Sequence, residues 1–160
     1  MGDCGTAGFK RVFSGRFDHA IDEKGRVSIP ARFREELERD GHDRLYITNF
    51  IDNGQRCLEL YPPNEWTRLL EKIREKTRFD TQMRAFQLFY IGGAHEVMVD
   101  KQGRILVPPK LREFAALGRE VTFSALTEHF QLWDKAALEQ VLKAAEDRFK
   151  DPEFFQKLGL

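Results

Sequence analysis

The sequence is poor in cysteine and has no long apolar run. Its 160 residues include only two cysteines, Cys4 and Cys57, which cannot build a disulfide framework and do not form a Cys-x-x-Cys pair. We therefore expect a reducing, cytoplasmic location. No run of consecutive apolar residues exceeds four, so no segment is expected to span a membrane.

Neither sign of charge is in excess over the whole chain. There are 26 Lys and Arg residues against 26 Asp and Glu residues, which excludes a polycation that binds nucleic acid through bulk charge. The charge is distributed unevenly, because residues 9–34 carry seven basic and three acidic side chains, a net charge of +4. Any nucleic-acid partner is expected to meet this local basic segment.

Catalytic and metal-binding motifs are also missing. The four histidines form no His-x-x-x-His or His/Cys ligand pair, and there is no Gly-x-Ser-x-Gly, Walker loop or Gly-x-Gly-x-x-Gly. Asp22 and Glu23 lie side by side, but on an exposed turn they would lack the burial that shifts a carboxyl pKa. The sequence therefore predicts no enzyme, no metal, no cofactor and no small-molecule substrate.

What the chain does contain is an internal repeat and enough apolar residues for a core. Apolar residues make up 41% of the chain and include 14 phenylalanines, which argues against disorder. Residues 22–35 align without a gap on residues 100–113, and six of the fourteen pairs are identical. The identical pairs are Asp22/Asp100, Gly25/Gly103, Arg26/Arg104, Pro30/Pro108, Arg34/Arg112 and Glu35/Glu113.

Each copy of the repeat predicts the same small unit. Apolar residues alternate with polar ones over 17–21 and 27–29, which is the period of a half-buried strand. Between them Asp22 and Gly25 suit the first and last positions of a turn. Pro30 suits the first position of a short helix, and two further strands follow. The second copy predicts strands over 95–99 and 104–107, a turn over 100–103 and a helix from Pro108 to near Gly118.

Longer helices are expected after each set of strands. Residues 64–79 and 80–91 carry apolar side chains on one face, with Asp80 or Thr81 as the cap of the second helix and Gly92-Gly93 as its stop. Asp134 can cap a last helix that Pro152 breaks. No Gly/Ser linker separates the two halves, so we expect them to share one core.

The repeated Asp-x-x-Gly-Arg turn, followed by apolar-x-apolar-Pro and a basic helix, resembles the AbrB/MazE swapped-hairpin module. Two copies in a chain of this length resemble the MraZ family more specifically. The resemblance implies an α+β, β-rich fold of two AbrB-like swapped-hairpin β-barrel half-domains with flanking helices, a pseudo-dimeric monomer. The expected domains are 13–91 and 92–150, with residues 1–12 and 151–160 as terminal extensions.

The resemblance also implies a function and partners. It predicts a sequence-specific DNA-binding transcriptional regulator of the bacterial division and cell-wall gene cluster, located on the nucleoid. Its expected partners are double-stranded DNA and further copies of itself in a cyclic ring, whose hairpins would bind several short direct repeats together. The alternative is a ring-forming protein-interaction scaffold that binds DNA only non-specifically.

The basic residues of the first repeat are the candidate DNA contacts. Arginine can hold guanine O6 and N7 with two hydrogen bonds or clamp a phosphate, and glycine lets a backbone approach closely. The alternative is a structural role, in which Arg26 pairs with Asp22 and the helix residues Arg32 and Arg34 are merely exposed to solvent. The resemblance favours DNA contact for Lys24 and Arg26 above the others. The full candidate set is Arg16, Lys24, Gly25, Arg26, Arg32, Arg34 and Arg104.

The two copies differ on the outward face of their hairpins. Ala20 and Ser28 of the first correspond to Met98 and Leu106 of the second, while Lys24 becomes a glutamine. A hairpin that is apolar on both faces suits burial between subunits, whereas the first keeps a polar, basic exterior. For Arg104, a phosphate contact and a structural pair with Asp100 are equally open.

Overall fold

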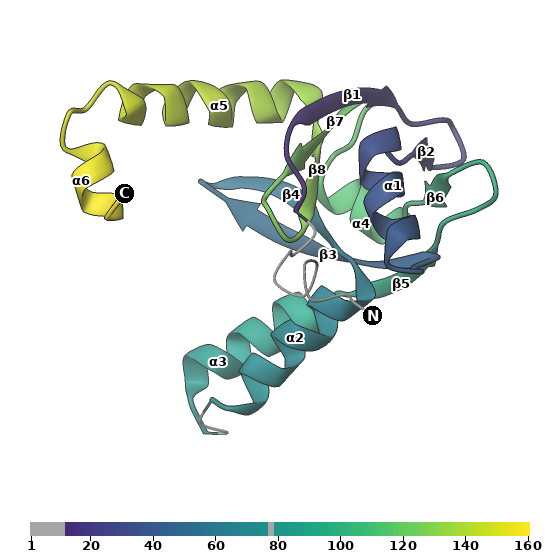
Figure 1. The fold of residues 1–160 in the computed structure, drawn as a ribbon, viewed down its shortest axis with the longest axis horizontal. Helices are drawn as coiled ribbons and strands as arrows, with labels where there is room; N and C mark the ends of the chain where they lie inside the picture. Colours follow the sequence, from purple (N-terminus) through teal and green to yellow (C-terminus); the bar gives the residue numbers. More distant parts are fainter. Residues whose placement is uncertain (1–11, 77–78) are drawn as a thin grey trace, which may run out of the picture.

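The computed structural model describes residues 12–76 and 79–160 (Figure 1). Within these residues, eight strands and several helices make an α+β, β-rich fold, as the resemblance implies. The elements in chain order are β1 Arg16–Ala20, β2 Arg26–Ser28, α1 Ala31–Arg39, β3 Arg44–Asp52, β4 Gln55–Tyr61, α2 Pro63–Arg74, α3 Thr81–Phe86, the π-helix η2 Gln87–Ile91, β5 His95–Met98, β6 Arg104–Leu106, α4 Pro109–Phe114, β7 Glu120–Ala125, β8 Phe130–Asp134, α5 Lys135–Phe149 and α6 Phe154–Leu158.

The strands on either side of each predicted turn separate and pair with the other repeat. Six strands form one sheet in the order β1-β7-β8-β4-β3-β5, and β2 pairs with β6 in a two-stranded ribbon. All these pairings are antiparallel. Strand β1 of the first repeat pairs with β7 of the second, and β5 of the second repeat pairs with β3 of the first. The hairpins are therefore exchanged between repeats, and the strands form two open sheets in place of a closed barrel for each half.

The expected common core exists. One cluster of buried residues draws on both repeats, from Phe13 to Leu132. Phe33 of α1 lies near its centre, with its ring centroid 5.3 Å from that of Phe17 and 4.6 Å from that of Phe130. The alternation predicted for the short strands is present, because Val27 and Ile105 are buried while their strand neighbours are partly exposed. Exchanging hairpins thus makes burial of one repeat depend on the other.

The segment between the repeats contains an unpredicted π-helix. The side chain of Asp80 caps α3 as expected, accepting hydrogen bonds from the backbone N–H groups of Gln82 and Met83. After Phe86 the helix widens to η2, where Asn49 Nδ2 donates to the carbonyl of Phe89 at 3.0 Å. Side chains from β3 thus hold carbonyls of the wider turn, as is usual where a helix departs from regular geometry. Helix α2 ends earlier than predicted, at Arg74.

A buried polar cluster connects this segment to both repeats. The carboxylate of Glu59 on β4 is 4% exposed and accepts hydrogen bonds from the Tyr90 hydroxyl and from Gln131 Nε2. His129 Nε2 lies 3.4 Å from Glu59 Oε2, and the Tyr61 hydroxyl shares a hydrogen bond of 2.7 Å with Tyr90. The cluster therefore links β4, the π-helix and the start of β8.

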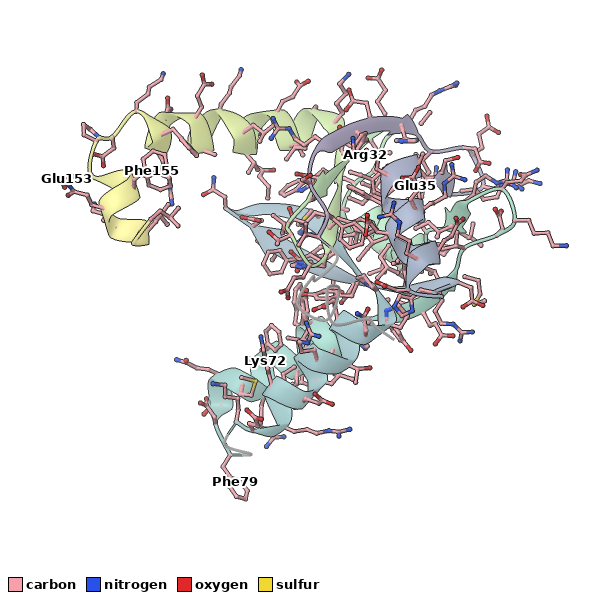
Figure 2. All side chains as sticks on the ribbon, viewed as in Figure 1. Arg32, Glu35, Lys72, Phe79, Glu153 and Phe155 are labelled. Atoms are coloured by element: carbon pink, nitrogen blue, oxygen red, sulfur yellow. The ribbon has the colours of Figure 1, made fainter. Side chains whose placement is uncertain are left out.

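The C-terminal helices project away from the sheets (Figure 1). Asp134 is the N-cap residue of α5, as predicted, but its side chain makes no capping hydrogen bond, and its Oδ1 instead accepts a hydrogen bond from the N–H of Gly118. Beyond Pro152 the chain folds back as α6, which carries Phe155 (Figure 2). The ring of Phe155 packs against that of Phe149, with centroids 5.3 Å apart. Among the described residues, none of the helices has the length and apolarity needed to cross a membrane.

Candidate nucleic-acid interface

Both repeats build the same turn around an aspartate. Asp22 Oδ1 accepts hydrogen bonds from the backbone N–H groups of Lys24 and Arg26, at 3.0 and 2.8 Å. Asp100 does the same for Gln102 and Arg104, both at 2.9 Å. The last residue of each turn is a glycine with a positive φ, a backbone conformation that residues with a Cβ rarely adopt. The sequence pattern therefore predicts these turns correctly.

Each turn also orients an arginine. Arg26 Nε donates to Asp22 Oδ2 at 2.8 Å, and Arg104 Nε donates to Asp100 Oδ2 at 3.2 Å. The structural pairs considered from the sequence are thus both formed. They use one of the five N–H donors of a guanidinium, and the two terminal nitrogens remain available for a guanine or a phosphate. Hydrogen bonds from the Arg26 backbone and side chain lower the pKa of Asp22, so the carboxylate stays ionised near neutral pH.

The two arginines lie on one face of the β2–β6 ribbon. In the antiparallel register Arg26 pairs with Leu106, and Ser28 pairs with Arg104. The residues between them, Val27 and Ile105, point into the core and are each 1% exposed. Because side chains alternate along a strand, the outer face of the ribbon consists of two rows, one from each pair.

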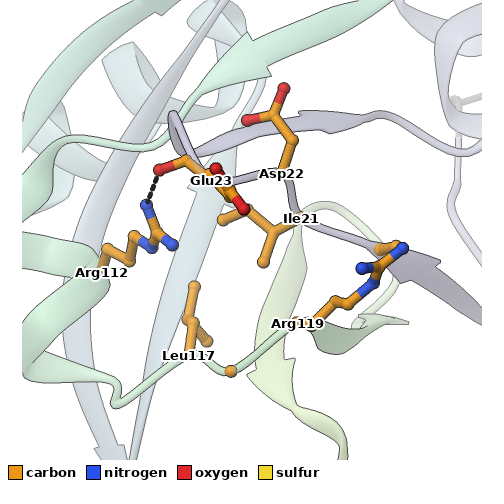
Figure 3. Close-up of a pocket in the computed structure, with 8 residues that line it drawn as sticks. Ile21, Asp22, Glu23, Arg112, Leu117 and Arg119 are labelled. Carbon is orange, nitrogen blue, oxygen red and sulfur yellow. Dashed lines mark hydrogen bonds between the residues drawn. The ribbon is translucent and has the colours of Figure 1, made fainter.

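Each turn is held in place by an arginine from the opposite repeat. Arg112 on α4 donates to the carbonyl of Glu23 at 3.2 Å, below the first turn (Figure 3). Arg34 on α1 extends to the carbonyl of Gln102 at 3.5 Å, and a Cβ on Gly103 would overlap it. Backbone bonds from Ile29 and Val107 to the turn glycines complete this reciprocal support.

The structure distributes the other predicted site residues over different surfaces. Lys24 is exposed at the first turn, and Arg32 is exposed on the first helical turn of α1 (Figure 2). Arg16 begins β1, six residues before the first turn, so an extended strand places it about 20 Å away. Arg34 is half-buried against the second turn rather than merely solvated.

Gly25 is explained by the protein alone. It is buried, its φ is +89°, and a Cβ there would meet the carbonyl oxygen of Val107 at 3.3 Å and the guanidinium of Arg112 at 3.4 Å. The glycine thus permits the close approach of the second repeat to the first turn. A contact between Gly25 and DNA stays a prediction.

Two candidate functional residues were not predicted from the sequence. Lys101 is exposed on the second turn, at the position that aligns with Glu23, so each turn carries one lysine at a different place. Arg112 supports the first turn, although it is distant in sequence. Its identity with Arg34 in the aligned repeats was the available signal, because equivalent residues of exchanged hairpins make equivalent contacts.

A pocket lies between the first turn and the segment after α4 (Figure 3). Its polar side chains carry two acidic and two basic groups, so it has no net charge with which to select an ion. Its labelled lining residues are Ile21, Asp22, Glu23, Arg112, Leu117 and Arg119. Over residues 12–76 and 79–160, no three His, Cys, Asp or Glu side chains gather as metal ligands would.

The two repeats correspond to two matches of one protein family. Residues 12–89 and 90–156 each match the family model described as "MraZ protein, putative antitoxin-like". The chain is similar to the transcriptional regulator MraZ of Syntrophobacter fumaroxidans, with 38% identity over 152 residues that cover 94% of this chain and 99% of the relative. It is 38% identical to the protein of that name from Natranaerobius thermophilus over 88% of this chain and 93% of the relative. For the protein from Desulforamulus reducens the identity is 40%, over 87% and 93%.

Proposed function

Because the chain belongs to the MraZ family, we propose that it is a DNA-binding transcriptional regulator that acts in the cytoplasm, on the nucleoid. The family is one of transcriptional regulators and not of enzymes. The lack of catalytic and cofactor motifs in the sequence agrees with that class.

One structural observation carries the proposal. Two rigid turns at opposite ends of the β2–β6 ribbon each hold an arginine by its Nε, leaving the terminal nitrogens free, and both turns protrude from the same side of the molecule (Figure 1). An arginine fixed before binding loses little freedom when it meets a guanine. A major groove about 12 Å wide accepts a two-stranded ribbon of this size.

The candidate residues take different roles in this proposal. Arg26 contacts a base, with Lys24 on the adjoining phosphate, and Arg104 takes the equivalent place in the second repeat. Arg34 acts as a positioning residue, because it supports the second turn. Arg16 and Arg32 are assigned to phosphates outside the groove, since neither belongs to a turn: Arg16 begins β1 and Arg32 lies on α1.

We further propose that several copies act together as a closed ring on short direct repeats, in the promoter of the division and cell-wall gene cluster. Half-exposed apolar side chains support self-association, because a ring of identical subunits can cover every such patch with the same contact. The side chains in question are Met98, Phe149, Phe155 and Leu158, which are 52%, 61%, 44% and 52% exposed. Light scattering that gives a monomer at every concentration would refute the ring.

Direct binding measurements test the proposal. The wild-type protein should prefer the DNA upstream of its own gene over a scrambled duplex of the same composition. Arg26→Ala should lose about 1–3 kcal/mol per contact, and Arg26→Lys should recover only part of it because an ammonium lacks the two-pronged geometry. Arg84→Ala, which removes the same charge from the exposed surface of α3, is the matched control and should bind normally.

The outcomes separate the regulator from its alternative. Equal affinity for promoter and scrambled DNA would leave the ring-forming scaffold with non-specific DNA binding as the better account. Unchanged promoter affinity of Arg26→Ala, with a native circular dichroism spectrum, would refute the assignment of the ribbon.

A further inference from the structure

The outer face of the ribbon is not the same in its two halves. One row consists of Arg26 and Leu106, and the other consists of Arg104 and Ser28. Leu106 is 54% exposed, although it lies on a strand whose middle residue is fully buried. A single exposed leucine is common on protein surfaces, but this one lies beside two arginines on the face that the proposed function turns toward DNA.

A neighbouring subunit is a poor partner for this leucine. Leu106 faces Arg26 directly across the ribbon, and its Cδ1 would lie 3.7 Å from a Cβ on Gly25. A protein surface that covered Leu106 would therefore also cover the first turn and its arginine. The sequence interpretation placed Leu106 between subunits, but the register places it inside the surface that the proposed function leaves open for DNA.

We propose that Leu106 contacts the methyl group of a thymine next to the base held by Arg26, and that the Ser28/Leu106 difference makes the recognised site non-palindromic. Opposite residues of an antiparallel pair are about 5 Å apart, which is one to two base-pair steps of 3.4 Å. In the major groove a thymine methyl is met by apolar side chains, whereas a serine hydroxyl is tolerant of several bases. The proposal rests on the proposed function.

The asymmetry has a direct consequence for the DNA. Two identical rows related by a twofold axis would select a palindrome, as symmetric DNA-binding dimers do. Here the arginines are equivalent and their row partners are not, so the two half-sites share the arginine-contacted base and differ at the neighbouring position. Such a site has a direction along the DNA, which suits repeats that all run the same way.

In vitro selection from random duplexes tests this with three proteins: wild type, Leu106→Ser and Ser28→Leu. The wild type should enrich a site with thymine beside one of two equivalent bases only. Leu106→Ser should lose that thymine and select a more palindromic site, and Ser28→Leu should gain a second thymine in the other half. Replacing the selected thymine by uracil, which removes only the methyl group, should weaken wild-type binding about fourfold and leave Leu106→Ser unchanged.

Other outcomes overturn the proposal. Identical selected sites for all three proteins would show that Leu106 does not determine specificity, although the regulator itself would stand. A Leu106→Ser protein with a smaller oligomer, whose affinity falls by the same factor for every sequence, would show that Leu106 lies between subunits. No enrichment by the wild type would refute the proposed function, and this inference with it.

Discussion

The buried carboxylate of Glu59 should contribute strongly to stability at neutral pH. Burial alone would raise the pKa of Glu59, but the contacts with His129, Tyr90 and Gln131 outweigh it and hold the pKa below its ordinary value. A group whose pKa is lower in the folded state stabilises the fold above its unfolded pKa of about 4.3. That stabilisation is lost as the pH falls through the lower, folded value.

The partners of Glu59 set the size of the effect. Glu59→Leu would leave the Tyr90 hydroxyl and the Gln131 amide without their acceptor, at about 1–3 kcal/mol for each unsatisfied group. Part of this is offset, because Tyr90 still meets Tyr61 and Gln131 Nε2 lies 3.2 Å from Asp52 Oδ2. We expect a loss of about 2–4 kcal/mol for Glu59→Leu. Glu59→Gln keeps one acceptor but turns an amide toward the Gln131 amide, and should lose about 1–2 kcal/mol.

Urea unfolding from pH 7 to pH 3 measures both effects. Other carboxylates, including Asp18 and Asp22, also have pKa values that the fold lowers, so the informative quantity is the difference in unfolding free energy between wild type and Glu59→Gln at each pH. This difference should be greatest at neutral pH and should shrink as the wild-type carboxylate becomes protonated. A Glu59→Gln protein as stable as wild type at pH 7, or two parallel pH curves, would refute the role assigned to the buried carboxylate.

Three further predictions concern the turns, the segment between the repeats and DNA binding. Asp22→Ala removes an acidic group near DNA yet should weaken promoter binding about tenfold, because Arg26 loses the carboxylate that orients it; tighter binding in a mobility-shift assay would contradict this. Gly93→Ala places a Cβ 2.1 Å from Asn49 Oδ1 and 2.8 Å from the carbonyl oxygen of Phe89, so thermal unfolding should show a loss of about 1–3 kcal/mol, and an unchanged Tm would show that this contact relaxes freely. The logarithm of affinity should fall with the logarithm of salt concentration by roughly 0.9 per neutralised phosphate, more steeply on DNA with three repeats than with one; equal slopes would exclude multivalent binding.

The turns and the buried faces were predictable because their causes are local. Aspartate at the first position and glycine at the last specify the turn through contacts within five residues, as Asp22 and Gly25 illustrate. The alternation around Val27 specifies which face of a strand is buried. Neither signal says which strand supplies the next hydrogen bonds, and the exchange of β1 to β7 came only from the family resemblance.

The contributions that were not predictable depend on contacts distant in sequence. Arg34 has the same local pattern as an exposed helix arginine, and only the folded second turn shows that it supports Gln102. The π-helix is held by Asn49, which lies on β3, so the sequence of the helical segment alone does not predict it. The separation of Arg16 from the first turn likewise follows from the direction of β1.

Joining both repeats in one chain removes the requirement that the two rows of the ribbon carry identical side chains. Each exchanged turn needs a side chain of the opposite repeat to hold it. Arg34 and Arg112 are both arginines because they make equivalent contacts with the two turns. A dimer of identical short chains would also present the same side chain twice on its ribbon. Within one chain Ser28 and Leu106 can differ, because neither side chain is buried. Buried aligned positions also differ, but there one apolar residue replaces another, whereas the change from a polar to an apolar side chain lies on the face proposed to meet DNA.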